Sequence, residues 1–282
     1  MTDQLLRCGR ISYTNDLPIY AAFDAGAVEC PATLVAGVPT ALNRMLLAGE
    51  LDVSPISSFF CAQHASEFRV IPGVCIGSLD AVRSIYLISQ PPPASLAGVP
   101  IAVTDESSTG RNLFATVCAE RHGFVPAFVT MKDPYGAHER DGAPCLVIGD
   151  KAIDAYLRTD PTNAYDVGSL WHDATGTHMV YALWAVRREV AERRPAEVDA
   201  LARSLTSAMR WGTSHRDKVI AAAQAAIARP ENFYLDYYRT LTFDFDREAW
   251  HGLETFYALA AKHGLLSGAP ALKVFEKDIA RV

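Results

Sequence analysis

The feature that most constrains this chain is a regular alternation of short apolar stretches with amphipathic ones, from its start to about residue 190. The short stretches, such as 99–103 and 145–148, have the length of buried strands. Such an alternation favours an α/β fold, in which helices flank a mostly parallel sheet. After the apolar stretch 178–186 the pattern changes, and three or four helices are expected, including 195–212 and 215–228.

Three consecutive prolines at 91–93 interrupt this alternation. A run of prolines is stiff and extended, so it predicts a connector between two units. We therefore expect two lobes, each with its own sheet. Residues 1–90 and 180–282 would form lobe 1, with the C-terminal helices, and residues 91–179 would form lobe 2. A ligand cleft is expected between them.

Composition excludes several classes of function. The 282 residues are 50% hydrophobic and carry a formal net charge of -6, without the basic surplus of a nucleic-acid-binding protein. No apolar stretch is long enough for a membrane helix, and the first residues do not resemble a secretory signal, so we expect a cytoplasmic protein without a membrane partner. The six cysteines are scattered, and neither they nor the eight histidines show metal-ligand spacing, so no metal is expected.

Candidate site residues come from the turns where a strand ends and a helix begins, because ligands of open α/β sheets bind there. Hydroxyls and free N–H groups at helix starts bind anions, although the same side chains also serve as helix caps. The candidate residues in these turns are Asn15, Ser54, Ser57, Ser107, Thr109, Gly149 and Asp150.

Two further candidates, Arg83 and Ser84, begin the strand expected at 84–89. An arginine there could pair with a substrate carboxylate or could simply face solvent. The chain has no nucleophile elbow, phosphate-binding loop or dinucleotide-binding turn. The residues therefore favour binding and positioning of a small anion rather than hydrolysis by paired acids.

Several blocks of the sequence, in this order, resemble the chorismate dehydratase family of the futalosine route to menaquinone. They are RISYTNDLPIY, GELDVSPISS, VRSIYLIS, LVIGDKAI, YDVGSLWHDATGTHMVYALWAVRRE and YYRTLTFDF. The resemblance covers most of the chain, and the blocks around IGDKAI and DVGSLWHDATG are the most specific. It implies the two-lobed fold of type-II solute-binding proteins, in agreement with the two lobes expected above.

The resemblance also implies a reaction. Chorismate would lose water to give 3-[(1-carboxyvinyl)oxy]benzoate, and no cofactor would be needed because aromatisation of the ring supplies the driving force. By position in the family's motifs, Asn15 would bond the departing hydroxyl or orient the ring, and Ser84 would bind a carboxylate. Ser107 and Thr109 would bind the second carboxylate. Asp150 would have an orienting or structural role, because an ionised carboxylate beside a dianion would repel it.

Two departures from the family pattern concern the pocket: the segment 175–182, and Gly110-Arg111 where relatives often carry a Thr-Ser pair. Arg111 could reinforce anion binding or face solvent. Two alternative functions also stay open. One is a non-enzymatic binding protein for a small carboxylate. The other is the sister enzyme 1,4-dihydroxy-6-naphthoate synthase, which typically has Cys-Pro-Asn-Asp where this chain has Tyr-Thr-Asn-Asp.

Overall fold

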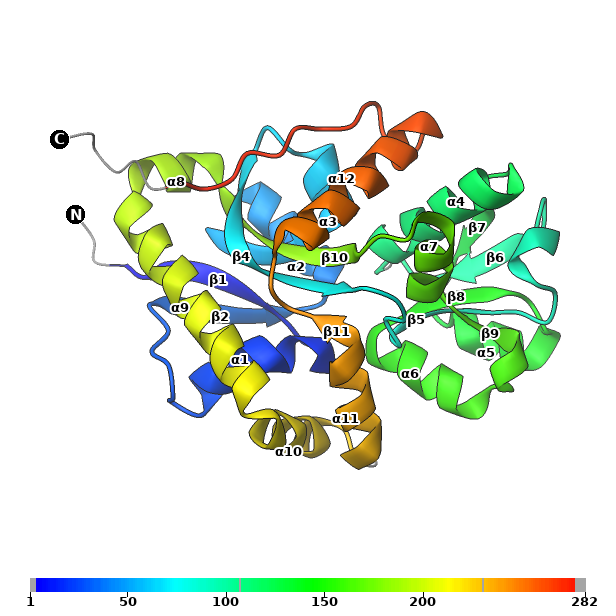
Figure 1. Cartoon of the computed structure of the whole chain (residues 1–282), viewed down its shortest axis with the longest axis horizontal. Helices are drawn as coiled ribbons and strands as arrows, with labels where there is room; N and C mark the ends of the chain where they lie inside the picture. The colour runs from blue at the N-terminus through cyan, green and yellow to red at the C-terminus, as the bar shows by residue number, and fades with distance from the viewer. Residues whose placement is uncertain (1–3, 107, 230, 277–282) are drawn as a thin grey trace.

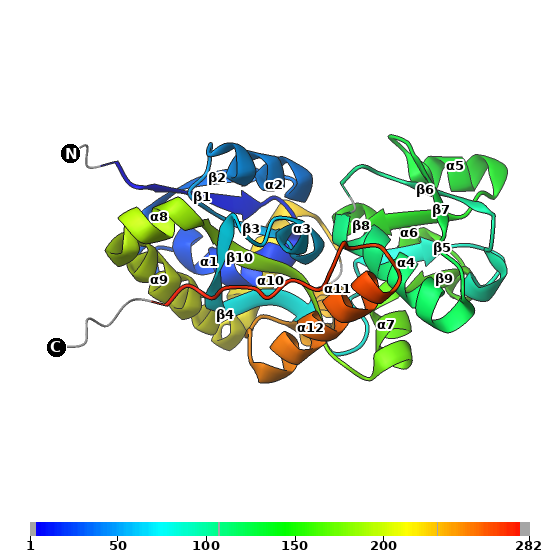
Figure 2. The same ribbon diagram turned by 90° about the horizontal axis from the view of Figure 1, so that it is seen from above.

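The computed structural model describes residues 4–106, 108–229 and 231–276. The chain folds into two α/β lobes that lie side by side (Figure 1), as the alternating pattern predicts. Each lobe is built around one sheet, and the chain passes from the first lobe to the second and back (Figure 2). Within the described residues, no helix is both long enough and apolar enough to cross a membrane.

The sheet of lobe 1 has six strands in the order β11-β4-β10-β3-β1-β2. Their bounds are β1 Leu6–Ile11, β2 Ala32–Gly37, β3 Val53–Ser57, β4 Phe68–Ser78, β10 Met179–Arg187 and β11 Leu241–Thr242. β1 pairs in parallel with β2 and β3, whereas β10 runs antiparallel to β3 and β4. The sheet is therefore mixed, because β10 returns from the other lobe in the opposite direction.

The sheet of lobe 2 has five strands in the order β7-β6-β8-β5-β9. Their bounds are β5 Ile85–Ile88, β6 Pro100–Val103, β7 Ala127–Thr130, β8 Cys145–Ile148 and β9 Ala164–Asp166. β6 is parallel to β7 and β8, and β5 is antiparallel to β8 and β9. This sheet is also mixed, because the incoming strand β5 runs against its neighbours.

The boundary between the lobes differs from the expected one. Residues 84–90 are expected in lobe 1, but β5 pairs with strands of lobe 2. The chain therefore crosses in residues 79–84 and returns in residues 176–178, and the three prolines lie inside lobe 2. The prolines mark a turn between β5 and β6 rather than a connector between lobes.

Helices cover the sheets and join the lobes. In chain order the helices of lobe 1 that precede the crossover are α1 Leu17–Asp24, α2 Pro39–Ala48 and α3 Ser58–Gln63. Those of lobe 2 are α4 Ser108–His122, α5 Pro134–Asp141, α6 Gly149–Arg158 and α7 Val167–Thr175. The C-terminal ones are α8 Arg188–Arg193, α9 Pro195–Ser214, α10 Arg216–Ala226, α11 Glu231–Thr240 and α12 Arg247–Lys262. α9 packs on α1, and α12 lies along β10 and contacts α4 of lobe 2 (Figure 2).

The core of lobe 1 contains large aromatic side chains whose polar atoms are hydrogen-bonded. Tyr20 and Trp184 are fully buried, and their rings stack with centroids 6.3 Å apart. The Trp184 indole N–H donates to the Tyr20 hydroxyl at 3.2 Å, and that hydroxyl donates to the carbonyl of Gly9 at 2.8 Å. Because each buried polar atom has a partner, burial of these rings carries little desolvation cost.

Candidate functional site

A cleft of ≈ 610 Å³, partly open to solvent, lies between the two lobes. This volume includes open solvent at the mouth of the cleft. The polar side chains that line it come from both lobes: Tyr13, Asn15, Ser57, Ser84, Glu106, Ser108, Thr109 and Tyr181. Apolar side chains complete the wall: Ile11, Ile76, Val82, Ile85 and Ile148.

Several helices begin at this cleft. Pro39 is the first residue of α2, Ser108 the first residue of α4 and Gly149 the first residue of α6, and all three line the cleft. Helix N-termini carry free N–H groups and the positive end of the helix dipole. The arrangement favours an anion in the cleft although the chain as a whole is acidic.

Asn15 lies in the short 3-10 turn Thr14–Asp16 and lines the cleft, as the sequence analysis expects. Its side-chain oxygen is buried and has no hydrogen-bond partner among the described residues. A buried amide oxygen without a partner is costly to leave unsatisfied, so it is suited to a ligand that supplies a hydrogen-bond donor.

Ser57 and Thr109 meet across the cleft. Ser57, at the end of β3, caps α3, and its hydroxyl lies 2.6 Å from the Thr109 hydroxyl on α4. Thr109 also donates to the backbone carbonyl of Tyr181 at 3.1 Å. These contacts join the two lobes at the floor of the cleft. Ser107, the other hydroxyl expected in this turn, lies outside the described residues.

The segment that carries Ser84 is held by Asp166, the N-cap of α7. The Asp166 carboxylate accepts hydrogen bonds from the backbone N–H groups of Val82 and Arg83, at 3.0 and 2.7 Å. Arg83 has φ 55°, a left-handed conformation that is unfavourable for a residue with a side chain. Ser84 follows directly and lines the cleft.

Three expected substrate-binding residues lie elsewhere. Ser54 is fully buried in β3, where its hydroxyl donates to the carbonyl of Pro55, because the expected polar turn at 54–58 continues as a strand through residue 57. The side chain of Arg83 does not contribute to the described cleft wall, although Ser84, which follows it directly, does. Asp150 is also absent from that wall, because both of its oxygens bind other side chains or backbone groups of the protein.

Gly149, by contrast, lines the cleft as expected. It has φ 66°, and a Cβ placed on it would lie 2.9 Å from the ring of Tyr13. Its N–H donates to the carbonyl of Ser84 at 2.8 Å. Only glycine combines this backbone conformation with such a close approach of an aromatic ring.

The sequence analysis missed Tyr13 and Glu106, which face each other across the cleft. The Tyr13 hydroxyl donates to Glu106 Oε2 at 2.9 Å, and Lys151 Nζ lies 3.9 Å from the same oxygen. Burial, together with the nearby negative charge of Glu106, raises the pKa of Tyr13, so this phenol stays protonated and remains a donor. Both residues directly adjoin the turns chosen as candidates, and that adjacency is the signal that could have found them.

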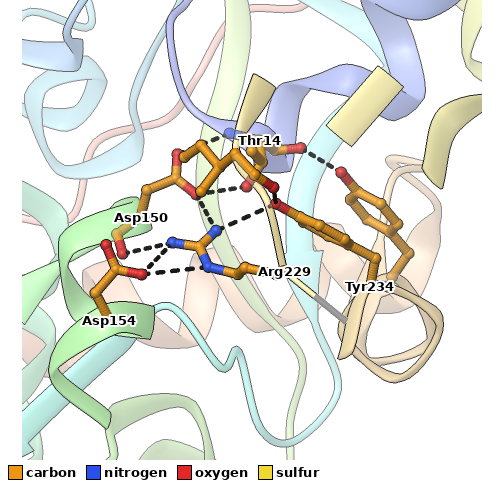
Figure 3. Close-up of polar contacts among 7 residues, drawn as sticks. Thr14, Asp150, Asp154, Arg229 and Tyr234 are labelled. Atoms are coloured by element: carbon orange, nitrogen blue, oxygen red, sulfur yellow. Dashed lines mark hydrogen bonds and ion pairs between the residues drawn. The ribbon is translucent and has the colours of Figure 1, made fainter. Parts of the chain in front are cut away.

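A charge cluster centred on the buried Arg229 ties α6 of lobe 2 to lobe 1 beside the cleft (Figure 3). Arg229, with its side chain 3% exposed, donates to Asp150 Oδ1 at 2.9 Å and to Asp154 Oδ1 at 2.6 Å. Asp150 also accepts hydrogen bonds from the backbone N–H and the hydroxyl of Thr14, at 3.1 and 2.6 Å. Asp150 thus has a neutralising partner and connects Arg229 to the residue before Asn15.

No metal centre is found in the part of the chain that the structure describes, where no three His, Cys, Asp or Glu side chains come together. All six cysteines are free thiols, and five of them are buried. The polar groups that line the cleft are hydroxyls, the Asn15 amide, helix N-termini and the Glu106 carboxylate.

The chain is similar in sequence to a known protein family and to individual proteins that share one name. Residues 6–262 match a protein family described as menaquinone biosynthesis. A protein named chorismate dehydratase from Thermus thermophilus is 31% identical over 206 residues, which cover 67% of this chain and 71% of that protein. Another protein of this name, from Campylobacter jejuni, is 26% identical over 178 residues, covering 62% of this chain and 64% of the relative.

Solved structures share the fold. A protein from Archaeoglobus fulgidus has a TM-score of 0.73 at 19% identity, covering 93% of this chain and 98% of that one. The periplasmic aliphatic sulphonate binding protein from Escherichia coli has a TM-score of 0.65 at 16% identity, with 100% and 97% covered. The two-lobed solute-binding-protein fold expected from the sequence is confirmed.

Proposed function

The chain belongs to the menaquinone biosynthesis family, and we propose that it is a chorismate dehydratase, a lyase that removes water from chorismate. The product is 3-[(1-carboxyvinyl)oxy]benzoate. The observation that carries the proposal is a cleft where helix N-termini meet neutral hydroxyls and the buried, unpartnered amide oxygen of Asn15. The helix N-termini and hydroxyl donors attract a dianion, and the Tyr13 hydroxyl and Lys151 Nζ near Glu106 Oε2 offset the negative charge that this carboxylate brings to the cleft.

In the proposed reaction, the ring hydroxyl leaves with the electrons of its C–O bond. A proton leaves the neighbouring ring carbon, and the electrons of that C–H bond complete the aromatic ring. The hydroxyl and the proton together form the released water. The Asn15 amide holds the departing hydroxyl: its NH₂ donates to the hydroxyl oxygen, and its buried oxygen accepts from the hydroxyl O–H. The Ser84 hydroxyl binds a carboxylate, which fixes the ring in the cleft.

We further propose that a carboxylate of the substrate takes the ring proton. Glu106 is a protein carboxylate in the cleft, but its Oε2 already accepts a hydrogen bond from Tyr13 and lies 3.9 Å from Lys151 Nζ. These contacts occupy the oxygen that would otherwise be free to accept the ring proton. Glu106→Gln should therefore keep more than about a tenth of the parental turnover, whereas general bases typically contribute roughly a hundredfold or more. A larger loss in the folded variant would make Glu106 the base.

The proposal includes a dehydration without a cofactor, since aromatisation drives it, and a site of action in the cytoplasm. The six free thiols agree with a reducing compartment. Purified protein should convert chorismate, without additives, into a product lighter by one water, detected by mass and ultraviolet spectra. Binding of chorismate without conversion would support the alternative of a binding protein. Turnover of a cyclic futalosine derivative in place of chorismate would support the sister enzyme.

A further inference from the structure

The turn that carries Asn15 is held by groups outside it. Thr14 donates its backbone N–H and its hydroxyl to Asp150, which belongs to lobe 2. The carbonyl of Thr14 accepts a hydrogen bond from the hydroxyl of Tyr238 on α11, at 2.8 Å. All three polar groups of Thr14 are therefore fixed by other elements, and two of these bonds cross between the lobes.

Asp150 is itself held from lobe 1. Arg229, between α10 and α11, donates to the Asp150 carboxylate and also to its backbone carbonyl, at 3.1 Å. It reaches the next turn of α6 through Asp154 and contacts the hydroxyl of Tyr234 at 3.3 Å (Figure 3). One guanidinium thus holds the start of α6 in place and neutralises the charge of Asp150. A lysine could not reproduce this set of hydrogen bonds, because it lacks the forked donor geometry of arginine.

We propose that Arg229 and Asp150 are positioning residues for Asn15, acting through Thr14. Asp150 reaches Thr14 only when α6 is docked on lobe 1, so Asn15 takes its place in the cleft when the lobes are together. Arg229 also neutralises Asp150, which lets a carboxylate lie beside a site for a dianionic substrate. The inference rests on the proposed function for its kinetic readout, and its structural readout is independent of that function.

The kinetic test compares Thr14→Val, which removes one hydroxyl bond to Asp150, with Thr14→Ser, which keeps it. Thr14→Val should lower kcat about ten- to a hundredfold, the range for loss of one hydrogen bond to a charged group. KM should change little, because Thr14 does not contribute to the described cleft wall. Thr14→Ser should recover most of the activity. Arg158→Gln, on the same helix α6 but exposed and paired with Glu139, serves as a matched control and should have no effect.

A double-mutant cycle with Asn15→Ala tests whether the effect passes through Asn15. The loss caused by Thr14→Val should largely disappear in the Asn15→Ala background, because the group that it positions is already gone. If the double variant instead showed the product of the two single-variant losses in kcat, the two residues would act independently and the proposal would be overturned. An Arg229→Met variant that melts earlier but retains parental kcat would also overturn it, since that result assigns Arg229 to stability alone.

The structural readout is hydrogen exchange of the amides in residues 11–17, where Arg229→Met and Asp150→Asn should exchange faster than the parent and Arg158→Gln should not. If the parent leaves chorismate unchanged, the proposed function fails, and the exchange rates still decide whether Arg229 and Asp150 hold the turn. Unchanged exchange in both variants would overturn the positioning role even if the parent is an active dehydratase.

Discussion

Asp166 offers a sharp test of how Ser84 is placed in the cleft. Its carboxylate accepts four backbone N–H groups, two from Val82 and Arg83 and two from the first turn of α7. Arg83 is bonded to one oxygen and the other three donors to the second oxygen. In Asp166→Asn the side-chain NH₂ must face at least one of these donors, and with the best orientation that donor is the N–H of Arg83.

The loss of stability expected in Asp166→Asn follows from the number of hydrogen bonds that the variant cannot make. A hydrogen bond to a charged group contributes about 1.5–3 kcal/mol. At roughly 2–4 °C of melting temperature per kcal/mol for a chain of this size, the melting temperature should fall by about 3–12 °C. Turnover should fall as well, because Arg83 is no longer held in its left-handed conformation and Ser84 follows it directly.

Arg83→Gly separates this positioning role from a direct contact with substrate. Glycine adopts a positive φ without strain, which stabilises the folded state. This gain roughly offsets the destabilisation that comes from the greater conformational entropy of the unfolded chain. Melting temperature, kcat and KM should therefore stay close to parental values, as measured by circular dichroism and steady-state kinetics. A rise of KM by about tenfold or more in Arg83→Gly would show that the guanidinium binds a substrate carboxylate. Parental melting and turnover in Asp166→Asn would refute the reasoning on Asp166.

Three further outcomes are expected. Gly149→Ala forces an unfavourable left-handed conformation and a Cβ 2.9 Å from the Tyr13 ring, so it should lose turnover and about 1–2 kcal/mol of stability, a result that parental melting would contradict. Thr109→Ala should weaken substrate affinity by about tenfold in a binding titration, and unchanged affinity would leave Thr109 as a link between lobes. Burial raises the pKa of Asp52, but the hydrogen bonds and charge of Arg7 outweigh burial and hold it below 3.8. The stability from this pair is therefore complete above about pH 4 and lost as the pH falls further, and acid melts of Asp52→Asn should lack this loss.

The sequence predicted the class of fold because alternation of strands and helices is a local property, readable from short windows. The strand 145–148 has the expected bounds. Sheet membership is not local, and the strand after Ser84 was assigned to the wrong lobe because the prolines that follow it read as a boundary. The turn expected around Ser54 was wrong for a related reason: proline and serine are typical of turns, but Pro55 lies within the buried strand β3.

The candidate site was predictable where its residues lie at helix starts. Asn15, Ser57, Thr109 and Gly149 all line the cleft, since the ends of strands converge there. Arg229 could not have been found in this way. It follows an alanine-rich helix, has no motif around it, and meets its two carboxylate partners only through the contact between lobes.

In the proposed reaction, this cleft dehydrates chorismate with the neutral amide of Asn15 at the departing hydroxyl. The most direct test is the kcat of Asn15→Asp with chorismate, measured beside the parent and with a thermal melt of both proteins. The substitution keeps the shape but replaces the amide donors with a carboxylate that only accepts hydrogen bonds when ionised. The proposed role of Asn15 predicts a folded variant whose kcat falls by about a hundredfold or more, as for loss of a donor that stabilises a transition state. A folded Asn15→Asp variant with near-parental kcat would contradict it and leave Asn15 as a turn residue.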